Sequence, residues 1–364
     1  MPGHGQGQGY AKVYRTSDGS GNRVPLGQTV FGAKTGDRFG HSVDIAADGN
    51  TIVIGSPGYS DDNRPGYVRV FSLVSDDDLG TNTWEQIGQV ITSEVDGDAV
   101  GCYVSISKDG KRIAVGAINF VRVYRMDDSR SNWIQIGDDI EDKVAYDGNS
   151  MSLSEDGNML AIGSPFIGIN GASSGQVTVY RFDGEGSSWE PLGQTHYGDK
   201  AGDLSGWSVD LSPDGKTLAI GSPGGILGDG DRPGYVRVFS LNVSDYDIGT
   251  SRWEPIGRDI IGEDDGDEFG DGVSLSYDGK TIAVSADWND GEYGMNSGHV
   301  RVYQLNDSRS DWIPIGGDID GKAAGDCSGR SVSLSADGDK VAIGSHLNAY
   351  NGTGAGHVVI YVLE

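Results

Sequence analysis

Apolar and polar positions alternate in short runs along the whole chain, as in Val209-Asp-Leu211 and Leu218-Ala-Ile220. A period of two is typical of β-strands whose two faces differ in polarity. Between these two runs stands Pro213-Asp-Gly215, in which proline sets φ, aspartate bonds its own backbone and glycine accepts a positive φ. The pattern therefore predicts a tight β-hairpin over residues 206–222.

The same hairpin recurs six times along the chain. Its turn glycines are Gly49, Gly110, Gly157, Gly215, Gly279 and Gly338. Each hairpin is followed by a run related to Val-Arg-Val-Tyr and then, in five cases, by a run that opens with tryptophan. Four short strands per repeat, with no helical periodicity, are typical of the blades of a β-propeller. We label the four predicted strands of each blade a to d.

A second level of repetition sets the number of blades. Residues 231–241 nearly copy residues 63–73, and residues 306–312 match residues 127–133. The chain thus reads as a three-blade unit used twice, which predicts an all-β, six-bladed propeller of four-stranded blades. A seven-bladed ring is the alternative.

The two ends of the chain are expected to meet in one blade. The N-terminal strands would complete the blade that begins with residues 331–345 and so close the ring. However, both Tyr10–Tyr14 and His357–Tyr361 read as strand c of that blade, which is one strand more than six blades need. We expect a single propeller domain over residues 1–364, with residues 1–9 as a flexible glycine-rich arm. Which copy of strand c closes the ring stays open.

Several segments resemble the FG-GAP repeat of integrin-α-type propellers. They are Phe39-Gly-His-Ser-Val43, Val53-Ile-Gly-Ser-Pro57 and Gly66-Tyr-Val-Arg-Val-Phe71. The resemblance implies a propeller that works in cell adhesion. The chain departs from that family in the a–b hairpin, where a short Asp-Gly turn replaces the family's Asp-x-Asp-x-Asp-Gly calcium loop. The family's calcium ligands are therefore not carried over.

The charge balance excludes several partners. The chain has 54 acidic and 27 basic residues, a net charge of −27. Such a field disfavours nucleic acids and anionic membrane surfaces and is compatible with divalent cations. No apolar run is long enough to cross a membrane, and the N-terminus lacks the apolar core of a signal peptide. Three Asn-x-Ser/Thr triplets, at Asn242, Asn306 and Asn351, agree with a secreted or cell-surface location.

Five of the six repeats carry Gly-Asp-x-x-Gly before strand a. The aspartates are Asp37, Asp98, Asp203, Asp267 and Asp326. The simpler explanation is that each carboxylate caps a turn by accepting backbone N–H groups. The functional alternative is a ring of Ca²⁺ ligands. The single best metal candidate is the acidic run 263–268, which adds Asp264 and Asp265, although a solvated acidic loop explains that run as well.

The b–c loops vary most between repeats, and variable loops on a rigid scaffold often bind ligands. Four of their aromatic side chains suit stacking on sugar rings or on protein side chains: Tyr59, Trp288, Tyr293 and Tyr350. The sequence therefore predicts a glycan or protein ligand at these loops.

No catalytic constellation stands out. The six histidines have no metal-ligand spacing, and there is no Gly-x-Ser-x-Gly motif. We therefore expect a non-catalytic binding or adhesion propeller, with Ca²⁺ as its candidate cofactor, rather than an enzyme. The first alternative is a carbohydrate-active enzyme, a glycoside hydrolase or lyase, that uses two loop carboxylates such as Asp267 and a neighbour. The second is a structural subunit that assembles through the redundant edge strand. Ligand identity and the choice between a monomer and an edge-linked oligomer stay open.

Overall fold

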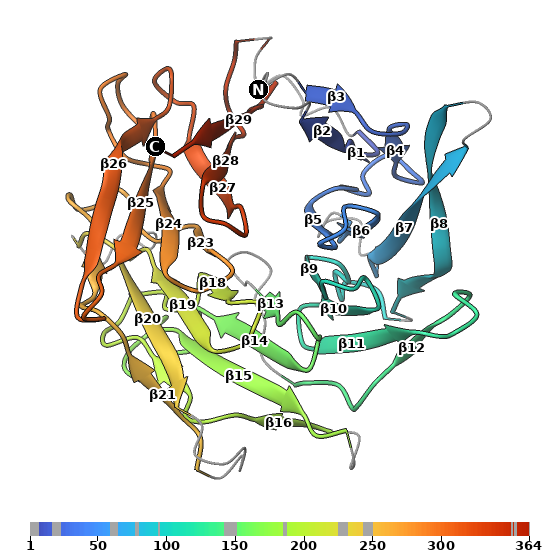
Figure 1. Cartoon of the computed structure of the whole chain (residues 1–364), viewed down its shortest axis with the longest axis horizontal. Coiled ribbons are helices and arrows are strands. Elements are labelled where there is room, and N and C mark those ends of the chain that lie inside the picture. Colours follow the sequence, from blue (N-terminus) through green and yellow to red (C-terminus); the bar gives the residue numbers. More distant parts are fainter. Residues whose placement is uncertain are drawn as a thin grey trace. The chain divides into compact units, whose positions relative to one another are not determined.

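The fold is an all-β, six-bladed propeller built of small antiparallel sheets (Figure 1), as the repeats predict. The computed structural model describes residues 7–16, 23–58, 65–76, 80–93, 95–141, 151–184, 188–224, 232–242, 250–350, 352 and 355–363. No helix capable of spanning a membrane occurs among these residues. The chain separates into two compact units, which are described in turn. The first comprises Met1–Tyr146, Glu155–Gly157 and Phe182–Trp189, and the second comprises Asp147–Ser154, Asn158–Arg181 and Glu190–Glu364.

The first unit holds two four-stranded sheets whose strands follow chain order. One sheet consists of β5 (Ser42–Ile45), β6 (Thr51–Ser56), β7 (Tyr67–Asp76) and β8 (Thr81–Thr92). The other consists of β9 (Tyr103–Ile106), β10 (Arg112–Gly116), β11 (Val121–Met126) and β12 (Trp133–Gln135). The predicted turns at Gly49 and Gly110 join the first two strands of each sheet, and both glycines have positive φ.

The N-terminal segment forms two small pairs within this unit. Strand β1 (Tyr10–Ala11) pairs with β4 (Val30–Phe31), and β2 (Tyr14–Thr16) pairs with β3 (Arg23–Pro25). Residues 7–9, expected in a flexible arm, instead make backbone hydrogen bonds to Gly32, Gly36 and Phe39. These last residues of the arm thus pack against the loop before β5, and the flexibility of the arm stays a prediction. Residues 1–6 lie outside the described residues.

The second unit holds most of the third sheet and all of the next three. The third sheet consists of β13 (Met151–Leu153), β14 (Met159–Ser164), β15 (Gln176–Phe182), β16 (Trp189–Pro191) and β17 (His196–Tyr197). The fourth consists of β18 (Ser208–Leu211), β19 (Thr217–Ser222), β20 (Tyr235–Asn242), β21 (Arg252–Pro255) and β22 (Ile260–Ile261). The fifth consists of β23 (Val273–Leu275), β24 (Thr281–Ala286), β25 (His299–Leu305) and β26 (Trp312–Asp320).

The last sheet contains β27 (Ser328–Leu334), β28 (Lys340–Ser345) and β29 (His357–Val362). Strand β29 pairs with β28 over six residue pairs and so takes the place of strand c. The other copy, Tyr10–Tyr14, contains β1, which pairs with β4, and the first residue of β2, which pairs with β3. Both copies are therefore paired within the chain. Closure of the ring by the N-terminal strands stays a prediction.

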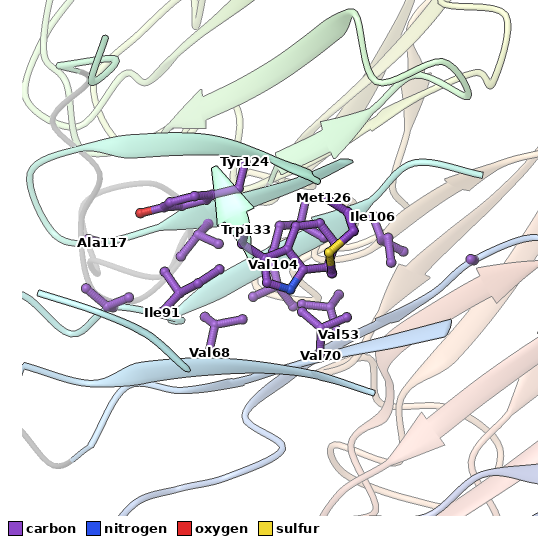
Figure 2. Close-up of a cluster of buried hydrophobic side chains, with 14 residues drawn as sticks. Val53, Val68, Val70, Ile91, Val104, Ile106, Ala117, Tyr124, Met126 and Trp133 are labelled. Atoms are coloured by element: carbon purple, nitrogen blue, oxygen red, sulfur yellow. The ribbon is translucent and has the colours of Figure 1, made fainter. Parts of the chain in front are cut away.

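Hydrophobic clusters join neighbouring sheets. In the first unit, Val53 and Val70 of one sheet pack with Val104 and Trp133 of the next, all of them buried (Figure 2). In β19, strand b of its blade, all six residues are buried. The small residues that alternate along this strand have a steric reason. A Cβ on Gly221 would lie 2.1 Å from the carbonyl oxygen of Gly270, so glycine lets the loop before β23 pack directly on β19.

Candidate functional site

The Gly-Asp-x-x-Gly aspartates act as turn caps in the structure. One carboxylate oxygen of Asp203 accepts the backbone N–H groups of Asp199 and Lys200 at 2.8 and 2.9 Å. The other oxygen accepts a 2.7 Å hydrogen bond from Arg232, and the hydroxyl of Tyr235 adds a further bond at 3.1 Å. These contacts hold the loop before strand a against the b–c loop of the same blade.

Equivalent aspartates are held in the same way. Asp37 accepts the N–H of Lys34 at 2.7 Å and the hydroxyl of Tyr67 at 2.8 Å. Asp326 accepts two backbone N–H groups and the side-chain amide of Asn348. Turn capping thus accounts for these carboxylates without a bound ion. Cation binding by them stays a prediction.

The structure separates the members of the acidic run 263–268. Asp264 and Asp265 are exposed, whereas Asp267 is buried and accepts a 2.6 Å hydrogen bond from the amide of Asn289. Glu268, the last residue of the run, is buried as well. Asp98, the remaining Gly-Asp-x-x-Gly aspartate, accepts a hydrogen bond from the hydroxyl of Ser93. Metal binding by the acidic run stays a prediction.

The aromatic candidates are on the surface. Trp288, Tyr293 and Tyr350 are 49, 47 and 91% exposed. The ammonium group of Lys322 lies 5.9 Å from the centre of the Tyr293 ring. Tyr59 lies outside the described residues. Ligand binding by these side chains stays a prediction.

A different group of side chains, which sequence reasoning missed, comes together in the second unit. Glu268 and Asp271 lie in the loop between β22 and β23, and Asp287 directly follows β24. One carboxylate oxygen from each lies within 4.8 Å of the others, and all three residues are buried. Within the described part of the chain, this is the one group of three acidic, histidine or cysteine side chains so arranged. We call it the acid cluster.

The acid cluster has few hydrogen-bond donors. Asp271 Oδ1 accepts a 2.7 Å bond from the indole N–H of Trp207 and a 3.0 Å bond from Nη1 of Arg330. The same Nη1 lies 3.8 Å from Asp287 Oδ2. Asp287 Oδ1 is buried and has no hydrogen-bond partner among the described residues. Three carboxyl groups thus share one guanidinium, which leaves negative charge uncompensated.

The pKa values reflect this imbalance. Burial, followed by the charges of Asp287 and Asp271, raises the pKa of Glu268 to about 8. Burial and the charge of Asp271 raise the pKa of Asp287 to about 7. Burial also raises the pKa of Asp271, while Arg330 and Trp207 oppose that shift. Shifts of this kind, caused by burial and like charges, are typical of functional sites.

One residue of the next repeat, Arg330, also contacts the cluster. Arg330 lies in β27, and its side chain is 45% exposed. Burial, followed by the positive charge of Arg330, lowers the pKa of His346, which follows β28. Cys327 is buried nearby, and burial together with the charge of Asp287 raises the pKa of its thiol. The ring of Phe166 lies edge-on to that of Trp207, with 6.1 Å between the ring centres. The cluster therefore lies between apolar and basic neighbours.

The sequence does contain a signal for this cluster, in the residues that differ between repeats. Glu268 occupies the first variable position of Gly-Asp-x-x-Gly, Asp271 follows the motif, and Asp287 follows strand b. The residues at the same positions elsewhere are Arg38, His41 and Pro57; Ala99, Cys102 and Ile118; Leu204, Trp207 and Pro223; and Cys327, Arg330 and His346. Among these repeats, one has an acid at all three positions. The cluster therefore arises from residues that differ between repeats and not from the shared aspartates.

No protein-family model and no curated protein matches the chain. Solved structures share its fold. A candidate 6-phosphogluconolactonase from Bacteroides uniformis is 14% identical, with a TM-score of 0.57 over 97% of this chain and 92% of that one. The periplasmic gluconolactonase PpgL of Pseudomonas aeruginosa is 18% identical, with a TM-score of 0.53 over 86 and 78%. The Cps50 (Swd1) β-propeller domain of Myceliophteria thermophila is 11% identical, with a TM-score of 0.57 over 100 and 98%.

At such identities these similarities show the propeller fold. They also correct the functional expectation. No family model supports the FG-GAP or integrin-type resemblance, so its adhesion, calcium and extracellular implications lose their basis. The prediction of a non-catalytic binding or adhesion propeller, and of a chain that is not an enzyme, was wrong. Two of the three neighbours above bear lactonase names, and none bears an adhesion name.

Proposed function

We propose that the chain is a hydrolase that opens the ring ester of a sugar-derived lactone, with the acid cluster and Arg330 as its site. The observation that carries this proposal is a set of three buried carboxyl groups beside one half-exposed guanidinium. The lactonase names of two structural neighbours support the substrate class by analogy of fold alone. The sequence left a carbohydrate-active enzyme, a glycoside hydrolase or lyase, as an alternative; the lactonase proposed here also acts on a sugar-derived substrate but cleaves an ester.

Lactone hydrolysis needs groups of the kind found here. A water molecule must lose a proton as its oxygen bonds to the carbonyl carbon, and Asp287 Oδ1 is free to accept that proton. The carbonyl oxygen gains negative charge at the same time, which a guanidinium such as that of Arg330 stabilises. The bond from the carbonyl carbon to the ring oxygen then breaks, and the ring oxygen takes up a proton. The product is an open-chain hydroxy acid.

The test is acid release from a panel of aldonolactones by the purified chain, followed with a pH indicator and corrected for spontaneous hydrolysis. We expect turnover that falls by about 10²-fold or more in Asp287→Asn, the size typical of a lost general base. Asp307→Asn, the same chemical change on an exposed turn, should retain full activity. Rates equal to the spontaneous rate across the panel, or equal losses in both variants, would overturn the proposal.

A further inference from the structure

The acid cluster also has the dimensions of a metal site. Its three carboxylate oxygens lie within 4.8 Å of one another. Oxygens that bind one Ca²⁺ at about 2.4 Å are separated by up to roughly 4.8 Å, and those around the smaller Mg²⁺ by somewhat less. A single ion placed among the three oxygens would thus reach all of them after small side-chain movements. The three residues come from two loops of one blade, so binding does not require other parts of the chain to move.

A second observation points to a ligand at this place. Asp287 is 1% exposed, and its Oδ1 atom has no hydrogen-bond partner among the described residues. A buried polar atom without a partner is costly, and native structures usually satisfy such atoms with protein groups, water or an ion. Asp287 contributes an oxygen to the cluster, so an ion bound there would lie beside this carboxylate.

Charge and ligand chemistry indicate the class of ion. Arg330 offsets one of the three acids through its bond to Asp271. Two further acids remain, and a divalent cation would balance them. The group contains carboxylate oxygens and neither histidine nor cysteine. Oxygen-only ligand sets suit the hard cations Ca²⁺, Mg²⁺ and Mn²⁺.

We propose that Glu268, Asp271 and Asp287 bind one divalent cation of this oxygen-preferring class. The site differs from the Gly-Asp-x-x-Gly aspartates, whose carboxylates are already engaged by N–H and hydroxyl donors. It uses the same side chains as the proposed hydrolase site but does not depend on that function, because an ion can bind whether or not a lactone is hydrolysed.

The experiment is calorimetric titration of the chelator-treated full chain with Ca²⁺, Mg²⁺ and Mn²⁺ in turn, together with thermal melts at saturating ion. We expect one equivalent of at least one ion to bind, and the melting midpoint to rise because the ion binds the folded state alone. Asp287→Asn and Glu268→Gln should each weaken binding by tenfold or more. Asp307→Asn, the same chemical change on an exposed turn, is the matched control and should bind as the parent does.

The outcomes separate the two proposals. Absence of binding by the parent chain would overturn the cation site. Binding that neither cluster variant weakens would overturn it too, because the ion would then occupy acids elsewhere on the surface. If one cluster variant fails to fold by circular dichroism, the other decides the question. Binding of an ion without lactone turnover would keep the cation site and reject the hydrolase. Lactone turnover that persists after chelation, in a chain that binds no ion, would keep the hydrolase and reject the cation site.

Discussion

The indole Nε1 of Trp253 donates a 2.9 Å hydrogen bond to the carbonyl oxygen of Leu192, which belongs to the preceding blade. The ring also lies against Gly193, where an added Cβ would come within 2.9 Å of it. The same pair of contacts recurs for Trp84 with Leu26 and Gly27, Trp133 with Ile87 and Gly88, and Trp312 with Ile256 and Gly257. The Trp-x-x-Ile-Gly run of strand d is therefore a contact between blades.

The first prediction separates this contact from backbone strain. Gly193 and Gly316 have similar positive φ values, 78° and 73°, but a Cβ on Gly316 would meet no atom within 4 Å. Alanine at either position adopts a left-handed conformation at a cost of about 1–2 kcal/mol. Gly193→Ala must also displace the Trp253 ring, which adds about 1–3 kcal/mol of overpacking. Urea unfolding should show the larger loss for Gly193→Ala, and equal losses would contradict the role of this contact.

The second prediction concerns the innermost strands. Asp210 in β18 accepts the backbone N–H of Leu275 in β23 at 2.8 Å and the hydroxyl of Ser152 in β13 at 2.9 Å. It thus links three neighbouring blades of the second unit. Asp210→Ala leaves the Leu275 N–H without this acceptor, which we expect to cost about 1–3 kcal/mol. Asp210→Asn retains an acceptor oxygen and should cost less. An unfolding free energy of Asp210→Ala equal to that of the parent would show that the link contributes nothing.

The third prediction is a dependence of stability on pH. Burial lowers the pKa of His196 to about 4, with Arg237 adding to the shift, and lowers that of His299 to about 4, with Arg301 adding and Asp318 and Glu263 opposing. In the unfolded chain, histidine titrates near about 6.5. Between these values the unfolded state binds more protons, so the free energy of unfolding decreases as pH falls from roughly 6.5 to 4. Above that range the histidines have no such effect.

The measurement is urea unfolding at several pH values between 4 and 7. We compare the parent with a variant that carries His196→Asn and His299→Asn, because carboxylates titrate in both proteins and cancel in the difference. The parent should lose more stability than the variant on acidification. Parallel pH curves would contradict the prediction.

The sequence predicts the blades of the propeller because the residues that build them recur in successive repeats. The hairpin glycines, the capping aspartates and the strand-d tryptophans recur at equivalent positions, so their roles can be read from one repeat and checked on the next. The acid cluster could not be predicted in this way. Asp287 joins Glu268 and Asp271 only through the pairing of strands a and b, and its pKa depends on burial that no local pattern reveals.

The FG-GAP resemblance misled for a related reason. A Cβ on Gly55 would lie 2.1 Å from the carbonyl oxygen of Gly101, and Phe39 is buried in the core. The glycines and the phenylalanine on which the resemblance rested therefore satisfy close packing between blades. Such residues report how blades pack, and they carry little information on what the propeller binds or hydrolyses.

The fourth prediction tests how Asp271 is held in the acid cluster. Trp207→Phe removes the 2.7 Å hydrogen bond to Asp271 Oδ1 and leaves the bond from Arg330 in place. Groups that orient a metal ligand typically contribute about 10–100-fold to metal affinity. We therefore expect cation affinity to fall by roughly tenfold or more, with the fold retained. Phe166→Leu is the control, because it removes the ring contact with Trp207 but keeps the indole N–H. If both variants weaken cation binding equally, packing of the two rings, and not the hydrogen bond, positions Asp271.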